Sequence, residues 1–299
     1  MDRQATLIAI DWGTTTARAY LLDADGTRIE RRTAPLGISQ VPAGTFPAAL
    51  AKLLGPWADF AVPRVASGMV GSRQGWVEAP YQKCPTSLSA LAGALTATPG
   101  GELRVVPGLL AADSGGIPDV MRGEETQLFG ALDADESVMA VLPGTHSKWA
   151  RVERGTVVSF ETYFTGELYA VLMEHSILGS MAERDSPAPG AAFDRGVGRG
   201  LASGALTHDM FGARTLALTG ALGPNEVGDW LSGLLIGAEI RGARRWLEGS
   251  SRPVRIVGGA GLTDRYERAL ILAGVSSEKG PPDAAALGLW RIAKQAGLV

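Results

Sequence analysis

One pattern of strands and turns occurs twice in this chain and constrains its fold more than any other feature. Residues 7–16, LIAIDWGTTT, read as an apolar strand ending in a Gly-Thr turn, and two further strands joined by an Asp-Gly turn follow. The segment 138–163, VMAVLPGTHSKWARVERGTVVSFETY, repeats this order of parts. Glycine lets the backbone approach an anion, and threonine adds an amide and a hydroxyl as donors. Either turn alone would be an ordinary hairpin turn. The pair predicts a nucleotide held between two related domains.

Size and composition narrow the class of protein. The 299 residues suffice for two domains of about 150 residues each. The net charge of −3 argues against a nucleic-acid partner. No apolar run approaches the ~20 residues of a membrane helix, which argues against a membrane partner. The lone Cys84 and the absence of a signal-peptide pattern at the N-terminus predict a cytoplasmic protein.

Strand and helix patterns alternate in both halves, which predicts an α/β fold. Beyond the two repeated segments, strands are expected at 64–72, 102–110 and 253–259. Helices are expected at 45–54, 88–95, 123–132, 166–181, 225–249, 262–274 and 281–295. The Gly/Ala-rich stretch 187–204 reads as a connection.

Asp11 is the first candidate for chemistry. It ends a buried strand just before Gly13, Thr14 and Thr15, where a carboxylate can hold Mg²⁺ that also binds phosphate oxygens. The alternative is a residue that only caps the turn. In the second turn, Gly144 and Thr145 are the matching residues, and the nearby Lys148 can also face phosphate.

A strand leads through a glycine-rich turn into a helix near the C-terminus. Gly258, Gly259 and Gly261 would present backbone amides and a helix dipole to an anion or a flat ring. The spacing is not the G-x-G-x-x-G of dinucleotide-binding proteins, and no G-x-x-x-x-G-K-[ST] loop occurs. These absences argue against a dehydrogenase and against a P-loop enzyme.

Glu124 and Glu125 start a helix just before the second hairpin. A carboxylate there can take a proton from a substrate hydroxyl as general base, or can simply stabilise the helix end. Trp76 lies in a glycine-rich loop before Ala79 and Pro80, where it can form the wall of a small-molecule site.

Several motifs together make the chain similar to a known family. These are IDWGTTTAR, SGMVGSRQGW, MRGEETQLFGA, LPGTHSKW, LSGLLIGAE and GGAGLTDRY. The chain resembles the 2-dehydro-3-deoxygalactonokinases, sugar-acid kinases of D-galactonate breakdown within the actin-like ATPase superfamily. The resemblance spans almost the whole chain and implies ATP-dependent transfer of a phosphoryl group to the carbon-6 hydroxyl of 2-dehydro-3-deoxy-D-galactonate. ATP and Mg²⁺ are the implied cofactors.

The resemblance also implies an architecture. Two actin-like (ribonuclease H-like) domains, each a mixed sheet flanked by helices, would enclose a nucleotide cleft. The domain with the sugar-acid site would comprise residues 1–122 and 284–299, and the domain with the adenosine site residues 123–283. The two Gly-Thr turns would grip phosphates and metal, the Gly258–Gly261 turn would receive adenosine, and the helix at 123–132 would be a hinge.

The chain departs from the superfamily at the expected base. The usual aspartate before the hinge helix falls on Gly123, so Glu124, whose side chain is one methylene longer, is the preferred base. Glu125 is the second choice, with Asp119 and Asp113 behind it.

The substrate's carboxylate needs a donor at the other end of the site. Candidates are Arg122, Arg73 and the backbone of Met69, Val70, Gly71 and Ser72. The alternatives to this function are a kinase of the same superfamily acting on another small sugar or sugar acid, and a non-catalytic actin-like nucleotide switch. The sequence leaves the oligomeric state open, with a homodimer as one possibility.

Overall fold

The structure is a computed structural model that describes residues 4–112, 115–183, 190–247 and 252–299. By its internal contacts the chain divides into two compact units. The first unit comprises Met1–Ser137, Val152–Glu161 and Pro281–Val299, and the second comprises Val138–Arg151 and Thr162–Gly280. This contact division keeps residues 123–137 with the first unit, whereas the sequence placed the boundary after residue 122. The domain boundaries stay a prediction.

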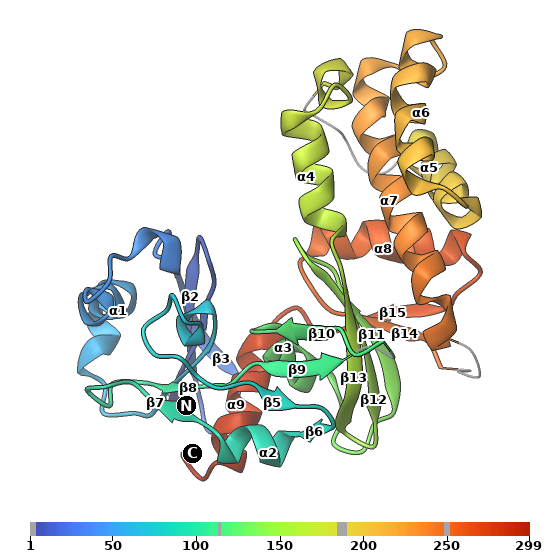
Figure 1. The fold of residues 1–299 in the computed structure, drawn as a ribbon. Coiled ribbons are helices and arrows are strands. Elements are labelled where there is room, and N and C mark those ends of the chain that lie inside the picture. Colours follow the sequence, from blue (N-terminus) through green and yellow to red (C-terminus); the bar gives the residue numbers. More distant parts are fainter. Residues whose placement is uncertain (1–3, 113–114, 184–189, 248–251) are drawn as a thin grey trace. The chain divides into compact units, whose positions relative to one another are not determined.

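The strands form three sheets (Figure 1). The first has the order β3-β2-β1-β4-β8-β7, the second β10-β9-β5, and the third β15-β14-β11-β12-β13-β6. The strands are β1 (Leu7–Trp12), β2 (Ala17–Leu22), β3 (Arg28–Ala34), β4 (Arg64–Gly68), β5 (Gln82–Lys83), β6 (Thr86–Ser87), β7 (Thr96–Ala97), β8 (Arg104–Val105), β9 (Leu109–Ala112), β10 (Pro118–Met121), β11 (Val138–Leu142), β12 (Ser147–Glu153), β13 (Thr156–Tyr163), β14 (Val254–Ile256) and β15 (Ser277–Lys279).

The helices alternate with these strands, which agrees with the predicted α/β class. They are α1 (Phe46–Leu54), α2 (Leu88–Gly93), α3 (Glu124–Ala131), α4 (Thr165–His175), α5 (Ala191–Ala202), α6 (Leu206–Leu218), α7 (Pro224–Leu247), α8 (Ala260–Leu272) and α9 (Ala284–Gln295). Short 3₁₀ turns occur at Ile38–Gln40, Gly55–Asp59, Met69–Gly71 and Gly179–Met181. No helix of the described residues is long and apolar enough to span a membrane.

The repeat found in the sequence is present in the fold. β1, β2 and β3 lie side by side, and β1 also pairs in parallel with the later strand β4. β11, β12 and β13 follow in the same order, and β11 pairs in parallel with the later strand β14. Both predicted Gly-Thr turns therefore follow a central strand whose parallel partner ends at the same edge.

Helices α3 and α9 cross very closely inside the first unit. A Cβ added to Gly130 of α3 would lie 1.8 Å from the carbonyl oxygen of Ala284, and one added to Gly288 of α9 would lie 1.8 Å from that of Thr126. Arg291 of α9 also donates to the carbonyl of Phe129, at 2.8 Å. The glycines allow this contact, which fixes the helix that carries Glu124.

The expectation of a connection at 187–204 is wrong for its described part, because residues 191–202 form helix α5. Glycine lowers helix propensity, but here it lets α5 lie against α7. A Cβ on Gly196 would lie 2.1 Å from the carbonyl oxygen of Trp230, and one on Gly200 would lie 2.2 Å from that of Leu234. Close packing thus outweighs the low propensity. Residues 187–189 lie outside the described part of the chain.

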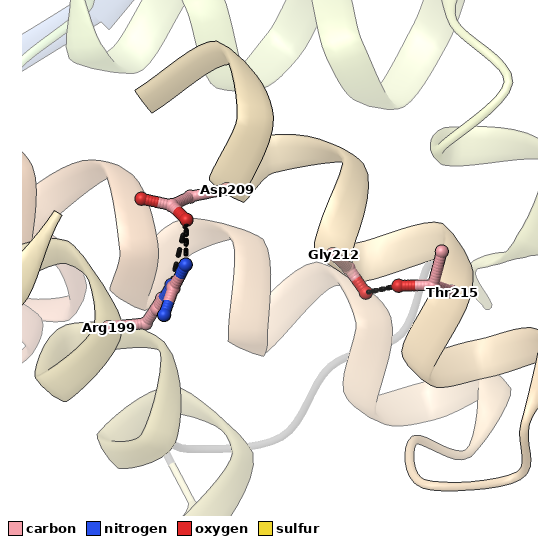
Figure 2. A network of polar contacts seen from close by, with 4 residues as sticks. All are labelled: Arg199, Asp209, Gly212 and Thr215. Carbon is pink, nitrogen blue, oxygen red and sulfur yellow. Dashed lines mark hydrogen bonds and ion pairs between the residues drawn. The ribbon is translucent and has the colours of Figure 1, made fainter. Parts of the chain in front are cut away.

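Helix α6, which the sequence did not predict, is joined to α5 by an ion pair (Figure 2). Nε of Arg199 donates to the buried carboxylate of Asp209 at 2.8 Å. Further along α6, the Thr215 hydroxyl donates to the Gly212 carbonyl at 3.2 Å, which is visible in the same view. With α4 and α7, these helices enclose an apolar cluster that includes Trp230, Leu231 and Leu234.

One expected strand is also divided. Within residues 102–110, Arg104–Val105 form β8 of the first sheet. After Val106–Gly108, the last two residues belong to β9 of the second sheet. The expected strand at 64–72 ends at Gly68 and continues as the 3₁₀ turn Met69–Gly71.

Candidate active site

The first Gly-Thr turn follows β1 as predicted. Asp11 is paired with Arg18 of β2, whose guanidinium lies 3.2 Å from the carboxylate. Burial raises the pKa of Asp11, and the charge of Arg18 partly offsets this. A desolvated carboxylate with an incomplete counter-charge favours a further cation. Thr14 and Thr15 are exposed beside it.

A neighbouring segment supports this turn from behind. The backbone amides of Gly37, Ile38 and Ser39 donate to the carbonyls of Thr15, Gly13 and Thr14 at 3.0–3.1 Å. The turn's carbonyls are thereby held away from its exposed side, as anion binding requires.

Residues 68–79 form a folded loop at the end of β4. Gly68 has φ of +91°, and a Cβ there would lie 2.7 Å from the Trp12 carbonyl oxygen. The Val70 carbonyl accepts from the amide of Trp76 at 2.9 Å, and the Gly71 carbonyl accepts from Ala79. The loop therefore has a fixed shape at the edge where β1 and β4 end.

Trp76 packs into the hydrophobic core of this unit. Its ring stacks on Phe46 at 5.9 Å between centroids and meets Trp12 edge-on at 6.3 Å. Core packing alone explains this tryptophan, so its predicted contact with a substrate stays a prediction.

Arg122 lies against this loop with part of its guanidinium unused. Nη2 donates to the Ala79 carbonyl at 2.8 Å, and the guanidinium lies 4.3 Å above the Tyr81 ring. Nε and Nη1 are buried with no hydrogen-bond partner among the described residues, and so is Oγ of Ser72. A Cβ on Gly71 would lie 2.9 Å from Nη1. Buried donors without partners are costly, and an anionic ligand would satisfy them.

The two candidate bases lie in different surroundings. Glu124 is partly exposed, and one of its carboxylate oxygens accepts from the Arg122 amide at 3.0 Å. Glu125 is fully buried, and accepts from the Gly123 amide at 2.6 Å and from the Thr126 hydroxyl at 3.1 Å. Burial and the nearby charge of Glu124 raise the pKa of Glu125 to about 8. Only Glu124 has access to a ligand at this helix start.

The start of α3 and the Asp11 turn lie at one edge of the first sheet. Trp12 pairs with Gly68 across the parallel strands, and the Cα of Gly68 lies 3.3 Å from a Cβ placed on Gly123. Glu124 thus follows a residue that touches the end of β4. Asp119, a lower-ranked candidate, lies in β10, and Asp113 lies outside the described residues.

The second Gly-Thr turn lies in the other unit, between β11 and β12. A Cβ added to Gly144 would meet nothing within 4 Å. His146 approaches Glu167 at 2.5 Å and stacks on Phe164. Lys148 is buried, with Nζ 3.4 Å from the His146 carbonyl oxygen. Its predicted contact with phosphate stays a prediction.

The predicted glycine-rich turn links β14 to α8. A Cβ on Gly259 or Gly261 would meet nothing within 4 Å, and one on Gly258 would make only ordinary contacts. Packing therefore does not require these glycines, and the space beside them is open to a ligand.

A cavity of about 220 Å³ lies within the second unit, beside the Gly144 turn and the first turn of α8. Its walls include Gly144 from the first of them and Leu262, directly after Gly261. The remaining lining residues, which sequence reasoning missed, are Thr165, Gly166, Tyr169, Ser232, Leu235, Ile236, Arg265 and Tyr266. They come from α4, α7 and α8, which carry no local motif that reveals a shared cavity.

Solved structures of low sequence identity define the class of fold. The activator of 2-hydroxyisocaproyl-CoA dehydratase from Clostridium difficile, solved with ADPNP, aligns over 97% of this chain and 93% of its own, with a TM-score of 0.52 at 14% identity. The chain therefore has the two-domain fold of the actin-like ATPases and sugar kinases.

The sequence places it more narrowly. The family model described as 2-keto-3-deoxy-galactonokinase matches residues 11–292. The 2-dehydro-3-deoxygalactonokinase of Escherichia coli (strain K12) is 37% identical over 266 residues, which is 89% of each chain. A crystal structure from Sinorhizobium meliloti, assigned as a 2-dehydro-3-deoxygalactonokinase, covers 96% of this chain and 98% of its own, with a TM-score of 0.89 at 37% identity. The chain belongs to the 2-keto-3-deoxy-galactonokinase family.

Proposed function

We propose that this protein is an ATP-dependent kinase that phosphorylates the carbon-6 hydroxyl of 2-dehydro-3-deoxy-D-galactonate. The family match over residues 11–292 carries the proposal. Three residues of the first unit near the ends of β1 and β4 support it. Asp11 is a carboxylate suited to Mg²⁺, Glu124 is a partly exposed carboxylate suited to act as a base, and Arg122 has two donors without a partner.

The sugar acid is assigned to the loop Met69–Ser72 and Arg122. Nε and Nη1 of Arg122 are charged donors of the kind that binds a carboxylate. The Ser72 hydroxyl is an additional donor. The substrate's carboxylate would lie here and its far hydroxyl near Glu124.

Glu124 is assigned as the base. As the hydroxyl oxygen attacks the γ-phosphorus, its proton passes to the carboxylate, and the bond from phosphorus to the bridging oxygen of ADP breaks. The Arg122 amide donates to one Glu124 oxygen, which helps to orient the carboxylate.

The cofactors are assigned to the glycine turns. Asp11 is a chemically suitable ligand for Mg²⁺, since this ion uses one or two carboxylates together with water and phosphate oxygens. The described residues contain no group of three or more acids, histidines or cysteines that would hold a metal alone, which fits such a site. When bound, Mg²⁺ neutralises phosphate charge. The phosphates are assigned to two sets of residues. Those of the first unit are Gly13, Thr14 and Thr15, and those of the second unit are Gly144, Thr145 and Lys148.

The adenosine is assigned to the turn with Gly258, Gly259 and Gly261 and to the cavity whose wall includes the next residue, Leu262. The open space over these glycines and the apolar side chains of Leu235 and Ile236 suit a flat ring. We further propose that the reaction takes place in the cytoplasm, since the single Cys84 is a free thiol.

A coupled assay for ADP release with a panel of sugar acids tests this function. We expect turnover with 2-dehydro-3-deoxy-D-galactonate to exceed that with other sugars and sugar acids, and NMR of the product to place the phosphate on carbon 6. A higher kcat/KM for a different acceptor would assign the protein to another reaction of the same kind. No ADP release with any acceptor would contradict the kinase assignment.

A further inference from the structure

Glu239 of α7 is a buried carboxylate that the proposed reaction does not use. Its side chain is almost inaccessible, and both oxygens are saturated with hydrogen bonds. Oε1 accepts from Oγ of Ser147 at 2.7 Å and from Nε1 of Trp149 at 2.8 Å. Oε2 accepts from Oγ1 of Thr165 at 2.5 Å and from Oη of Tyr266 at 2.7 Å.

Stability alone does not account for this residue. Burying a carboxylate costs more free energy than burying an apolar side chain of similar size, even when the charge is well paired. What the carboxylate supplies, and an apolar side chain does not, is a set of directed contacts. They join one helix to three other elements, β12, α4 and α8.

Those contacts end at the walls of the nucleotide cavity. Ser147 directly follows the turn Gly144–His146, while Thr165 and Tyr266 line the cavity. Behind Thr165, the Glu167 amide donates to the Thr145 carbonyl at 2.9 Å. A Cβ on Gly166 would lie 2.3 Å from the Gly144 carbonyl oxygen, so α4 and the turn touch directly. Glu239 thus contacts both the strand that follows the Gly144–Thr145 turn and two residues of the cavity wall, Thr165 and Tyr266.

We propose that Glu239 is a positioning residue for nucleotide binding, which sets the Gly144–Thr145 turn against the cavity that receives the nucleoside. This rests on the assignment of that cavity to ATP. Glu239 contacts no ligand itself. Its loss affects nucleotide affinity, and leaves the sugar-acid site in the other unit unchanged.

The test compares two substitutions at this position. In Glu239→Leu no acceptor remains for the four donors, and we expect the Kd for MgADP to rise about tenfold or more. In Glu239→Gln the amide oxygen still accepts from Ser147 and Trp149, and the NH₂ can donate to the oxygens of Thr165 and Tyr266. This conservative variant restores the Kd to within about threefold of wild type.

Steady-state kinetics separate positioning from general damage. In Glu239→Leu the KM for ATP rises, whereas kcat at saturating ATP and the KM for the sugar acid stay near wild type. Thr165→Val removes one of the four contacts in a side chain of similar shape, and raises the KM for ATP in the same direction by a smaller factor. If Glu239→Leu does not fold, the KM for ATP of Thr165→Val tests the proposal in its place.

Asp209→Asn is the matched control, since it removes a different buried carboxylate of the same unit, the partner of Arg199 shown in Figure 2. We expect it to lower Tm with no change in the Kd for MgADP. The proposal is overturned if folded Glu239→Leu binds MgADP as tightly as wild type, or if Thr165→Val has a wild-type KM for ATP. It is also overturned if Glu239→Leu loses affinity for the sugar acid in parallel. If the wild-type protein itself binds no MgADP, it is the ATP assignment that fails.

Discussion

At the scale of single residues, the two adjacent glutamates at the start of α3 lie in opposite surroundings. Glu124 is partly exposed, whereas Glu125 is fully buried and bound to Gly123 and Thr126. Successive residues of a helix point about 100° apart, so one of two neighbours can face a ligand while the other enters the core. The sequence ranked Glu124 first on its reach, and its accessibility supports the same choice.

Glu124→Gln keeps the side chain's size and removes its ability to accept a proton. We expect kcat to fall by about 10²–10⁴, the usual contribution of a general base, with nucleotide affinity unchanged. Single-turnover kinetics and MgADP titration measure the two quantities. Glu125→Gln is the control and should reduce kcat much less. A larger loss in Glu125→Gln would move the base by one residue, and a loss confined to sugar-acid affinity would make Glu124 a substrate ligand.

Asp11→Asn tests the proposed metal carboxylate. The amide cannot supply the full negative charge that Mg²⁺ requires, so turnover should fall by at least about a hundredfold while the protein stays folded. Arg18→Gln removes only the exposed partner of Asp11 and serves as the comparison. Near wild-type turnover of Asp11→Asn at ordinary MgATP concentrations would remove Asp11 from the metal site.

Glu125 should also make stability depend on pH. Its pKa is about 8 in the folded protein and lies near the ordinary 4.5 in the unfolded chain. Between these values the unfolded chain releases the proton that the folded protein keeps, so stability present below pH 4.5 is lost as the pH rises through about 8. In Glu125→Gln this loss is absent. We expect the free energy of unfolding of the variant, relative to wild type, to rise by up to about 5 kcal/mol over this range. Urea denaturation at several pH values measures it, and a constant difference would show that Glu125 titrates normally.

At the scale of elements, the sequence predicted best what depends on local pattern. Local patterns predicted the strands around both Gly-Thr turns, the turn from β14 into α8, and helices α3 and α9. Glycine or aspartate marks the ends of these elements. Helix α5 was missed because its glycines argue against a helix locally and are explained only by α7. Glu239 lies in the motif LSGLLIGAE, but the motif does not reveal its role, because its hydrogen-bond donors lie from 27 to 92 residues away.

The glycines of α5 allow a test within one helix. Gly196→Ala and Gly200→Ala place a Cβ about 2 Å from carbonyls of α7 and should lower the free energy of unfolding by about 1–3 kcal/mol. Gly198→Ala meets nothing within 4 Å and should be neutral or stabilising by up to about 1 kcal/mol. Chemical denaturation gives the three values. Equal effects at all three positions would mean that α5 and α7 do not pack this closely.

At the scale of the whole molecule, the chain divides its predicted ligands between two compact units. The residues proposed for the sugar acid, Asp11 and both candidate bases belong to the first unit, while the cavity proposed for adenosine belongs to the second. The protein carries a net charge of −3, and both substrates are anions. Recognition of these anions therefore depends on a few hydrogen-bond donors at defined positions rather than on the electrostatic field of the whole protein. Such donors can be removed one at a time.

Ligand-induced stabilisation measures the two sites separately. A ligand that binds only the folded protein stabilises it by about 2.7 kcal/mol at a hundred times its Kd, which is visible as a rise in Tm. Arg122→Met should remove most of the rise caused by the sugar acid, because the unpaired Nε and Nη1 are lost, and should preserve the rise caused by MgADP. Arg73→Met is the control. Its side chain is 87% exposed and pairs only loosely with Glu78, so both rises should persist. Loss of the sugar-acid effect in Arg73→Met rather than in Arg122→Met would transfer the carboxylate to the exposed arginine.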